Sequence, residues 1–205
     1  MLRYLLRSIR DRLQPVRTKG TNNSVAIDSK IGRGFRMMVS GNNNEVVIGK
    51  NCILSNTTIS ISGDNNRLII RNKARFYGPC QILLGGDGEL IIGENAGIRG
   101  VEFNVEHGRM EIGELCMFSY GITLRNHDSH CIIEPKSGDV LNPTKDVVLG
   151  RHVWVGQNAT ILKGCNIGAD SVIGFGSIVT KNCPPGSVMT GIPAKIVKEN
   201  INWDY

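Results

Sequence analysis

Several features that mark common protein classes are missing from this sequence. No apolar run is long enough to span a membrane, and no signal-peptide core precedes a cleavage site. The six cysteines form no CxxC pair, and several occupy positions suited to a small apolar residue. We therefore expect free core thiols in a protein of the reducing cytoplasm, and we assign no cysteine as a nucleophile.

Aromatic residues are scarce, at 5% of the 205 residues, whereas glycine is abundant, with 25. This composition suits thin layers of aliphatic side chains joined by many corners. The length fits one domain rather than two ordinary domains with separate cores.

A six-residue repeat runs from Val147 to Thr180. One position of the repeat holds only branched apolar residues, and the next is usually glycine. The apolar position comprises Leu149, Val155, Ile161, Ile167, Ile173 and Val179. A helix turns every 3.6 residues and cannot keep every sixth residue on one face, whereas short strands separated by corners can. The repeat therefore predicts a β-solenoid.

The same apolar–glycine pair recurs upstream with wider spacing, at Ile31-Gly32, Ile48-Gly49, Ile92-Gly93 and Ile112-Gly113. Three faces make a coil of about eighteen residues, and about eight such coils would cover most of the chain. The runs 41–44 and 63–66 contain glycine and asparagine, which tolerate left-handed backbone, so we expect corners there rather than disordered linkers.

The first seventeen residues predict a separate element. Apolar residues share one helical face, and arginines occupy most of the remainder, up to Pro15. The predicted basic amphipathic helix at 1–17 could cap the open end of the solenoid, or it could lie on an anionic membrane surface. Both roles keep the protein inside the cell, in the cytoplasm or at the inner face of the membrane.

The net charge of +6 comes largely from these N-terminal arginines. The chain lacks basic residues interleaved with aromatics and lacks a nucleic-acid motif, so no nucleic-acid partner is predicted. A phosphorylated cofactor, an anionic polymer or a membrane accounts for the charge equally well.

The segment VVLGRHVWVGQNATILKGCNIGADSVIGFGSIVTKN, followed by CPPGSVMTGIPAK, resembles the left-handed β-helix hexapeptide acyltransferases. Within that family it is most similar to sugar O-acetyltransferases that modify bacterial capsules, polysialic acid included, and O-antigens. The strong resemblance covers about residues 119–198. It implies a triangular left-handed parallel β-helix, acetyl-CoA as co-substrate, no metal, and a homotrimer with active sites between neighbouring solenoids.

The stretch from Arg125 to Ile132 resembles the family's S-D-x-H-x-I motif, whose histidine is the general base. By that match the base is His130, and the tryptophan that shapes the acceptor site is Trp154. A neutral imidazole can take a proton from a sugar hydroxyl as the oxygen attacks the thioester. His127 is the rival base, and either Asp128 or a backbone carbonyl could orient the His130 ring.

The resemblance also implies an acetyl-CoA site in the last coils. Its contacts would be Gln157, Phe175, Thr180, Lys195 and Lys198, with Lys181 nearby. Such a site needs backbone donors along the pantetheine and cations near the phosphates. Phe175 departs from the family's usual alanine, and its ring could narrow the groove or stack near the cofactor. The loop at 131–145 interrupts the repeat between His130 and Trp154 and is the expected acceptor-shaping element.

These assignments divide the chain into three parts: the basic helix at 1–17, the β-helix acetyltransferase domain at 18–186, and a C-terminal tail at 187–205 that contributes to the CoA site. The predicted function is transfer of acetyl to a hydroxyl of a bacterial surface glycan or its precursor. One alternative is acetylation of a small sugar, amino sugar or serine-like metabolite. Another is a zinc-binding or noncatalytic β-helix, although the spacing of the four histidines does not resemble the zinc subfamily's pattern.

Overall fold

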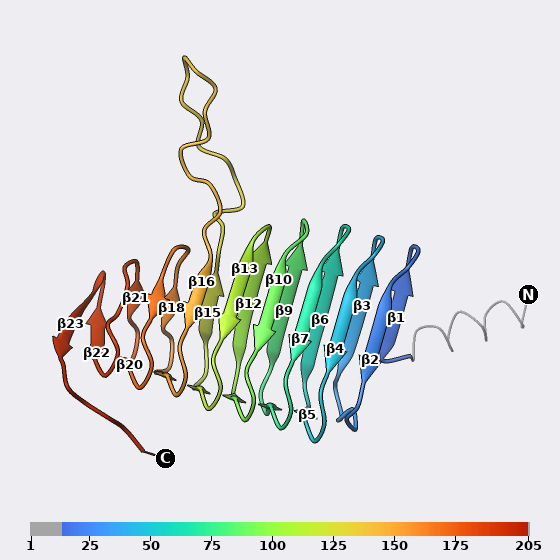
Figure 1. Ribbon diagram of the computed structural model, residues 1–205, viewed down its shortest axis with the longest axis horizontal. Helices are drawn as coiled ribbons and strands as arrows, with labels where there is room; N and C mark the ends of the chain where they lie inside the picture. Colours follow the sequence, from blue (N-terminus) through green and yellow to red (C-terminus); the bar gives the residue numbers. More distant parts are fainter. Residues whose placement is uncertain (1–13, 205) are drawn as a thin grey trace, which may run out of the picture.

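The computed structural model describes residues 14–204, which form 23 strands and no helix. The strands wind into one elongated coil that runs from blue to red in Figure 1. Within these residues, no helix is long and apolar enough to cross a membrane. The all-β solenoid predicted from the six-residue repeat is therefore confirmed.

The helix predicted for residues 1–17 falls mostly outside the described residues. Its last two residues, Val16 and Arg17, instead begin strand β1 (Val16–Lys19). Val16 pairs in parallel with Met37 of the next coil. Pairing with an open sheet edge satisfies the main-chain groups here, so the helix prediction is wrong at residues 16 and 17.

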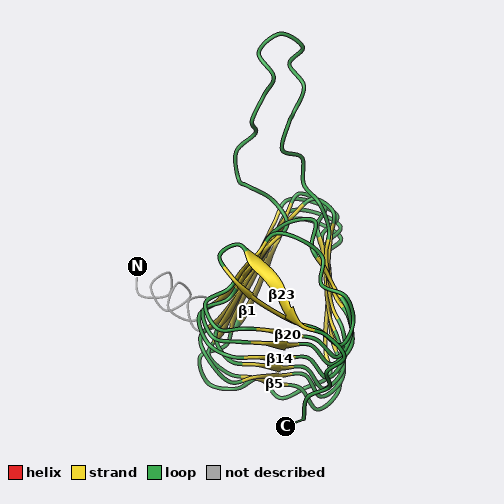
Figure 2. Ribbon diagram, turned by 90° about the vertical axis from the view of Figure 1, so that its left-hand side faces the viewer, coloured by secondary structure: helices red, strands yellow, loops and turns green. Residues whose placement is uncertain are grey.

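Three sheets form the three sides of the coil (Figure 2). The first sheet contains β1, β3 (Arg36–Ser40), β6 (Thr57–Ser62), β9 (Cys80–Gly85), β12 (Val101–Glu106), β15 (Ile122–Arg125), β18 (Thr160–Ile161) and β21 (Ile178–Val179). The second contains β2 (Ser24–Ile27), β4 (Glu45–Ile48), β7 (Arg67–Ile70), β10 (Glu89–Ile92), β13 (Arg109–Ile112), β16 (Val147–Leu149) and β19 (Asn166–Ile167). The third contains β5 (Ile53–Leu54), β8 (Arg75–Phe76), β11 (Gly97–Ile98), β14 (Met117–Phe118), β17 (Trp154–Val155), β20 (Val172–Ile173), β22 (Val188–Gly191) and β23 (Ala194–Lys198).

Inward-facing side chains fill the coil with stacked aliphatic layers. Strands of one sheet pair in register, so that Leu90 lies between Leu68 and Met110 of the neighbouring coils. The six apolar positions of the repeat, from Leu149 to Val179, are all buried, with at most 1% of each residue exposed. Their burial confirms that every sixth residue of this segment faces the coil axis.

The predicted corners contain asparagine in left-handed backbone conformations. Asn43 and Asn65 have φ angles of 56° and 59°. The residues that follow, Asn44 and Asn66, are buried, and Asn66 Nδ2 donates to Asn44 Oδ1 (2.9 Å). This ladder satisfies the amide groups that the corner buries, so successive corners stack in register as the strands do.

We number the corners in chain order. The first corner joins the first sheet to the second, the second corner joins the second sheet to the third, and the third corner leads into the next coil. At the first corner, a loop over residues 126–146 replaces the tight turn after β15 and projects well beyond the coil (Figures 1 and 2). Ile133 and Val140 pair as an antiparallel bridge within it. Its ends meet because Lys145 N donates to Asn126 O (3.1 Å).

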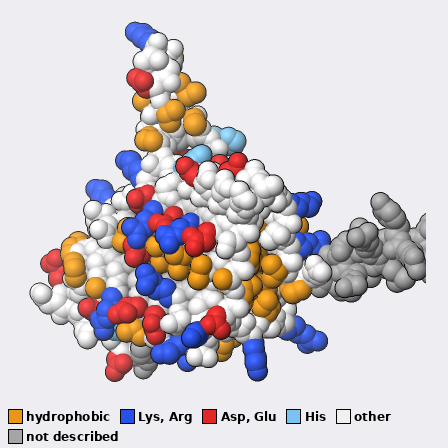
Figure 3. Space-filling model, turned by 45° about the vertical axis from the view of Figure 1, so that its right-hand side comes forward, with side chains coloured by type: hydrophobic (Ala, Val, Ile, Leu, Met, Phe, Trp, Pro, Cys, Tyr) orange, Lys and Arg blue, Asp and Glu red, His pale blue; other side chains and the backbone are white. Residues whose placement is uncertain are grey.

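The projecting loop carries apolar side chains on its surface. Ile132, Ile133, Val140 and Leu141 are 47–59% exposed. Figure 3 shows apolar side chains gathered on the loop, with histidine side chains at its base. Exposed apolar side chains that gather in one place commonly mark a surface of interaction.

The C-terminal end of the coil is closed by a short antiparallel pair. β22 continues the third sheet in parallel with β20, and β23 turns back along β22. Figure 2 shows β23 lying across the end of the coil, and Figure 1 shows the last residues turning back beneath it. The third sheet therefore extends into the segment assigned as the tail at 187–205.

All six cysteines are free, as expected, and five of them are buried. Burial raises the pKa of the Cys116 thiol to about 12 and that of Cys165 to about 11. Both thiols therefore stay protonated near neutral pH and are poor nucleophiles. Cys131, on the projecting loop, is the exposed exception.

Candidate active site

The base of the projecting loop carries both candidate histidines. His127 comes just after β15, and its side chain turns against the coil, so that only 8% of the residue is exposed. Its Nε2 donates to Asn104 Oδ1 (2.8 Å), and its Nδ1 accepts from the Ser129 N–H (3.0 Å). Both ring nitrogens thus hold partners that suit a neutral imidazole.

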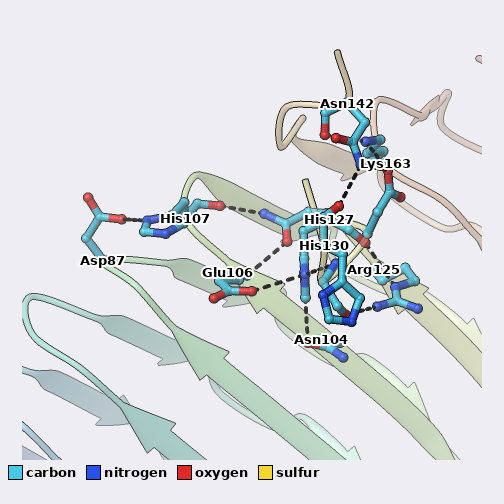
Figure 4. A network of polar contacts seen from close by, with 12 residues as sticks. Asp87, Asn104, Glu106, His107, Arg125, His127, His130, Asn142 and Lys163 are labelled. Atoms are coloured by element: carbon cyan, nitrogen blue, oxygen red, sulfur yellow. Dashed lines mark hydrogen bonds and ion pairs between the residues drawn. The ribbon is translucent and has the colours of Figure 1, made fainter. Parts of the chain in front are cut away.

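The surroundings of His127 favour that neutral form. Burial has the largest effect and lowers its pKa below 6.5; the Glu106 carboxylate, 3.2 Å from Nδ1, raises it, and the Arg125 charge lowers it again. Arg125 also donates to the His127 carbonyl (3.0 Å) and to Ser129 Oγ (2.8 Å). These contacts, drawn in Figure 4, fix the start of the loop against the coil.

His130, the predicted base, is exposed at the same place (Figure 4). Asn142 Nδ2 donates to the His130 carbonyl (2.9 Å), and Asn142 Oδ1 accepts from the Ile132 N–H (2.6 Å). The main chain from His130 to Ile132 is therefore held. The His130 ring makes no hydrogen bond with any residue in 14–204, so its nitrogens are free to meet a substrate.

Asp128 does not orient the His130 ring. Its carboxylate forms an ion pair with Lys163 of the next coil and accepts from Asn142 Nδ2 (2.9 Å). The hydrogen bond from Lys163, and then that from Asn142, lowers the pKa of Asp128. Lys163 also donates to the Asn142 carbonyl (2.8 Å), so Asp128 and Lys163 together tie the loop to the coil.

The other two histidines are corner residues. His107 and His152 have φ angles of 50° and 56°. His107 Nδ1 lies 2.9 Å from Asp87 Oδ1, and His152 Nδ1 lies 2.9 Å from Asp170 Oδ1. No group of three or more histidine, cysteine or carboxylate side chains in the described part of the chain is arranged to hold a metal ion.

A cleft of about 260 Å³ opens at the base of the loop, and His130 shares its wall with Cys131, Val140 and Thr144. Small-molecule sites are commonly larger than this. The cleft can therefore hold one end of a ligand, with the rest of the ligand lying outside it.

Trp154 lies on the opposite side of the coil from His130. It belongs to β17 of the third sheet, and 45% of the residue is exposed. Figure 2 shows the projecting loop at one corner and the third sheet across the far side. The Trp154 main-chain N–H donates to the Ser171 carbonyl (2.9 Å), so the indole is the part available to a ligand. A single chain does not bring His130 and Trp154 together.

The predicted acetyl-CoA contacts divide between different sides of the coil. Gln157 and Phe175 lie one above the other at the third corner, after β17 and β20. Thr180 and Lys181 follow β21 at the first corner, on the side of the projecting loop. All four residues are exposed.

The remaining two contacts, Lys195 and Lys198, belong to β23 at the C-terminal end of the coil. These two lysines and Lys181 are exposed, and none of them forms an ion pair with another residue of 14–204. Cations without carboxylate partners are suited to binding phosphates, but the assignment of these three lysines to coenzyme A stays a prediction.

Sequence reasoning did not single out several residues of this region. Asn104 and Lys163 come from other coils, and only the stacking of coils brings them to the loop. Asn142 lies within the loop and carries no recognisable motif. Trp203 could have been singled out from the sequence, because it is one of only two tryptophans in the chain. It donates from Nε1 to the carbonyl of His152 (2.9 Å).

Comparison with known protein families finds the same six-residue repeat. A family model described as bacterial transferase hexapeptide (six repeats) matches residues 146–181. A polysialic acid O-acetyltransferase of Neisseria meningitidis is 38% identical over 189 residues, which is 90% of this chain and 87% of that protein. Similarity therefore extends well upstream of the segment whose motifs are recognisable.

Two solved structures resemble the whole coil. The polysialic acid O-acetyltransferase OatWY superposes with a TM-score of 0.88 at 36% identity, covering 94% of this chain and 92% of that one. The polysialic acid-specific acetyltransferase NeuO superposes with a TM-score of 0.80 at 33% identity, covering 93% and 88%. The upstream coils therefore share their arrangement with these proteins as well.

Proposed function

Because the chain belongs to the hexapeptide-repeat sugar O-acetyltransferases, we propose that it transfers acetyl from acetyl-CoA to a hydroxyl of an acidic bacterial capsular glycan or its precursor. Polysialic acid is the first acceptor to test, because the similar proteins carry that name. One observation carries the proposal. Of the four histidines, His130 alone has an exposed ring without a hydrogen-bonding partner in residues 14–204, and it lines a cleft.

In this proposal His130 is the general base. Acetyl-CoA supplies the acetyl group as a thioester. The neutral ring takes the proton from the acceptor hydroxyl as its oxygen forms the new ester bond, and the bond between carbon and sulfur breaks. The imidazolium then returns the proton to the departing sulfur, so no covalent acyl-enzyme is required. His127 is less suited to this role, because it is buried and both of its ring nitrogens are engaged.

A complete site in this proposal needs two neighbouring chains in a homotrimer of left-handed β-helices. His130 lies at the first corner and Trp154 on the third sheet, on opposite sides of one coil, so a cyclic arrangement can set the first corner of one chain against the third sheet of the next. The predicted acetyl-CoA contacts are divided as well, because Thr180 and Lys181 lie at the first corner and the other four lie on the third sheet or at the corner that follows it. The exposed apolar side chains of the projecting loop support a contact between chains at this corner.

The outer face of the third sheet supports an acidic acceptor. A depression of about 570 Å³ on this face is lined by Arg75, Tyr77, Arg99 and Tyr120. It spans β8, β11 and β14, the strands that precede β17 and Trp154 in the sheet. Neither arginine forms an ion pair with another described residue. Guanidinium groups bind carboxylates, and the tyrosine rings offer faces to sugar rings.

The test incubates the purified full chain with acetyl-CoA and a panel of acceptors. The panel contains polysialic acid, polysialic acid with its carboxylates reduced to alcohols, a neutral polysaccharide, sialic acid, small sugars and serine. Thiol release gives the rate, and mass spectrometry locates the ester. We expect polysialic acid to be acetylated and the carboxyl-reduced polymer to react far more slowly.

Two arginine variants connect that result to the depression. Arg75→Ala and Arg99→Ala should raise the KM for the acidic polymer, whereas Arg36→Ala, an exposed arginine on the first sheet, should not. Transfer to small sugars or serine alone would support the alternative acceptor class. Absence of transfer to every hydroxyl acceptor would contradict the proposed function.

Two further predictions from the sequence stay predictions. The first is the N-terminal helix, as a cap or as a contact with anionic membrane, which is wrong at residues 16 and 17 and otherwise falls almost wholly outside the described residues. A cytoplasmic location, which would give the enzyme acetyl-CoA, is consistent with the proposed reaction and is to be tested by cell fractionation.

A further inference from the structure

The last residues of the chain run back along the outside of the coil. After β23, the Ile201 N–H donates to the Gly186 carbonyl (2.9 Å), and Trp203 Nε1 donates to the His152 carbonyl (2.9 Å). The segment therefore passes from the C-terminal end of the coil to the earlier coil that carries Trp154 (Figure 1).

The Trp203 indole is held in one place. It stacks on the His152 ring with 4.0 Å between ring centroids and 11° between planes. His152 is itself buried, and its Nδ1 lies 2.9 Å from Asp170 Oδ1. Stacking on a fixed ring, together with the hydrogen bond from Nε1, sets both the plane and the direction of the indole.

The same indole reaches Trp154. Their ring centroids are 6.0 Å apart, with the planes tilted by 45°, which is within the range of favourable aromatic pairs. Because Trp154 is 45% exposed on the outer face of the third sheet, the two indoles form one aromatic surface there. These are the only tryptophans in the chain.

We propose that Trp203 is a positioning residue of the acetyl-transfer site, which holds the Trp154 indole in the orientation that receives the acceptor sugar. This rests on the proposed function, in which Trp154 shapes the acceptor site. The C-terminal segment, which lies outside the repeat, thereby becomes part of the site.

The physical reason is pre-organisation. An exposed tryptophan on a flat sheet can occupy several rotamers. A sugar that binds only one of these rotamers binds less tightly as the population of the other rotamers grows. Trp203 occupies one side of the Trp154 indole and reduces that freedom. Its removal should therefore weaken productive acceptor binding while leaving acetyl-CoA binding alone.

The experiment compares Trp203→Ala and Trp203→Phe with wild type in the full chain, using the acceptor that wild type acetylates. Trp203→Ala should lower kcat/KM for the glycan about tenfold, since small misplacements of a binding group have effects of at least this size. The KM for acetyl-CoA should stay within about twofold of wild type. Trp203→Phe should recover most of the loss, because a phenyl ring can still stack on His152. Ile53→Ala, an exposed apolar residue elsewhere on the third sheet, is the matched control and should leave both constants unchanged.

Two results would overturn the inference while the proposed function stands. In the first, wild type is active and Trp203→Ala has the same kcat/KM for the glycan as wild type. The second is a parallel rise in the KM of both substrates with a fall in melting temperature, which indicates only a structural role. An inactive wild type would instead show that the proposed function fails.

A spectroscopic measurement tests the pairing without any activity. Two coupled indoles produce an exciton couplet in far-ultraviolet circular dichroism. We expect the couplet in wild type and its loss in both Trp203→Phe and Trp154→Phe. Absence of the couplet from folded wild type would overturn the inference whatever the enzyme acetylates.

Discussion

The side-chain amide of Asn142 donates a hydrogen bond to the main-chain carbonyl of His130 (2.9 Å). Its oxygen accepts from the Ile132 N–H (2.6 Å), so one residue near the end of the loop holds the segment that carries the candidate base. The contact is intrinsic to one chain and positions the His130 main chain before any substrate binds.

Removing this amide should impair the reaction more than the fold. Asn142→Ala should lower kcat about tenfold, because the His130 segment loses its anchor, and should leave the KM for acetyl-CoA unchanged. Steady-state kinetics with both substrates provides the measurement. Ser137→Ala, at the loop tip, removes a hydrogen bond to Asp139 (2.6 Å) and serves as control. Equal activity of both variants would show that Asn142 does not position the base.

Substitution of each of the two neighbouring histidines should have a different effect, one on catalysis and the other on stability. His130→Ala should lower kcat by a factor on the order of a hundred or more, with little change in melting temperature or in acetyl-CoA affinity. His127→Ala should remain substantially active but lose about 1–3 kcal/mol of unfolding free energy, because Asn104 Oδ1 and the Ser129 N–H lose their partner. Kinetics and chemical denaturation measure the two effects. If the variants exchange behaviours, the base is His127.

The stabilising contribution of His127 should depend on pH. Burial lowers its folded-state pKa below 6.5, the ordinary value that the ring regains on unfolding. Between these two pKa values the unfolded chain binds the additional proton, so the contribution is complete above pH 6.5 and is lost as the pH falls through the folded pKa. The difference in unfolding free energy between wild type and His127→Gln should therefore shrink toward acid. A difference that stays constant would contradict a buried neutral ring.

Cys131 offers a chemical test of the cleft. It lies beside His130 in the cleft wall and is exposed, whereas the other five thiols are buried. A bulky maleimide should label the native protein once, at Cys131, and block acetyl transfer by filling the cleft. Mass spectrometry counts the label, and Cys131→Ser, compared with its own untreated activity, should be insensitive to the reagent. Full activity after complete labelling would show that acetyl transfer does not take place in the cleft.

Mixed trimers should show whether His130 and Trp154 act from different chains. His130→Ala and Trp154→Ala are each expected to be nearly inactive. After subunit exchange at equal amounts, about a quarter of the sites in a cyclic assembly combine an intact histidine with an intact tryptophan, so about a quarter of wild-type activity should return. The same two proteins mixed without exchange should stay inactive. Failure of exchanged trimers to regain activity would indicate that each chain forms its own site.

The inward-facing core was predictable because burial repeats at a fixed interval. Leu149 and its successors at every sixth position leave no other regular structure that buries them all. The corners at Asn43 and Asn65 were predictable for a similar local reason, since few residues accept a left-handed backbone. Strand β1 was not predictable in this way, because the apolar pattern of residues 1–17 favours a helix, and only the pairing with Met37 of the next coil makes Val16 and Arg17 part of a strand.

The site was predictable only as separate pieces. Motif resemblance selects His130 and Trp154, but it carries no information about which side of a coil each occupies. The burial of His127 depends on Asn104, 23 residues earlier, which becomes its neighbour only when the coils stack. The contact between Trp203 and His152 spans 51 residues and follows no repeat, so only the folded chain reveals it.

The hydrogen bond between Lys145 N and Asn126 O joins the two ends of the projecting loop where it leaves the coil. Because the chain leaves and re-enters the coil at one point, the outer part of the loop, between Ile132 and Leu141, can lengthen, shorten or change sequence without shifting any strand on either side of it. Since the sequence predicts that this loop shapes the acceptor site, we expect acceptor preference to diverge among related enzymes through this one insertion, while the stacked core is inherited unchanged. Such a scaffold would allow related enzymes to modify different glycans without a new fold.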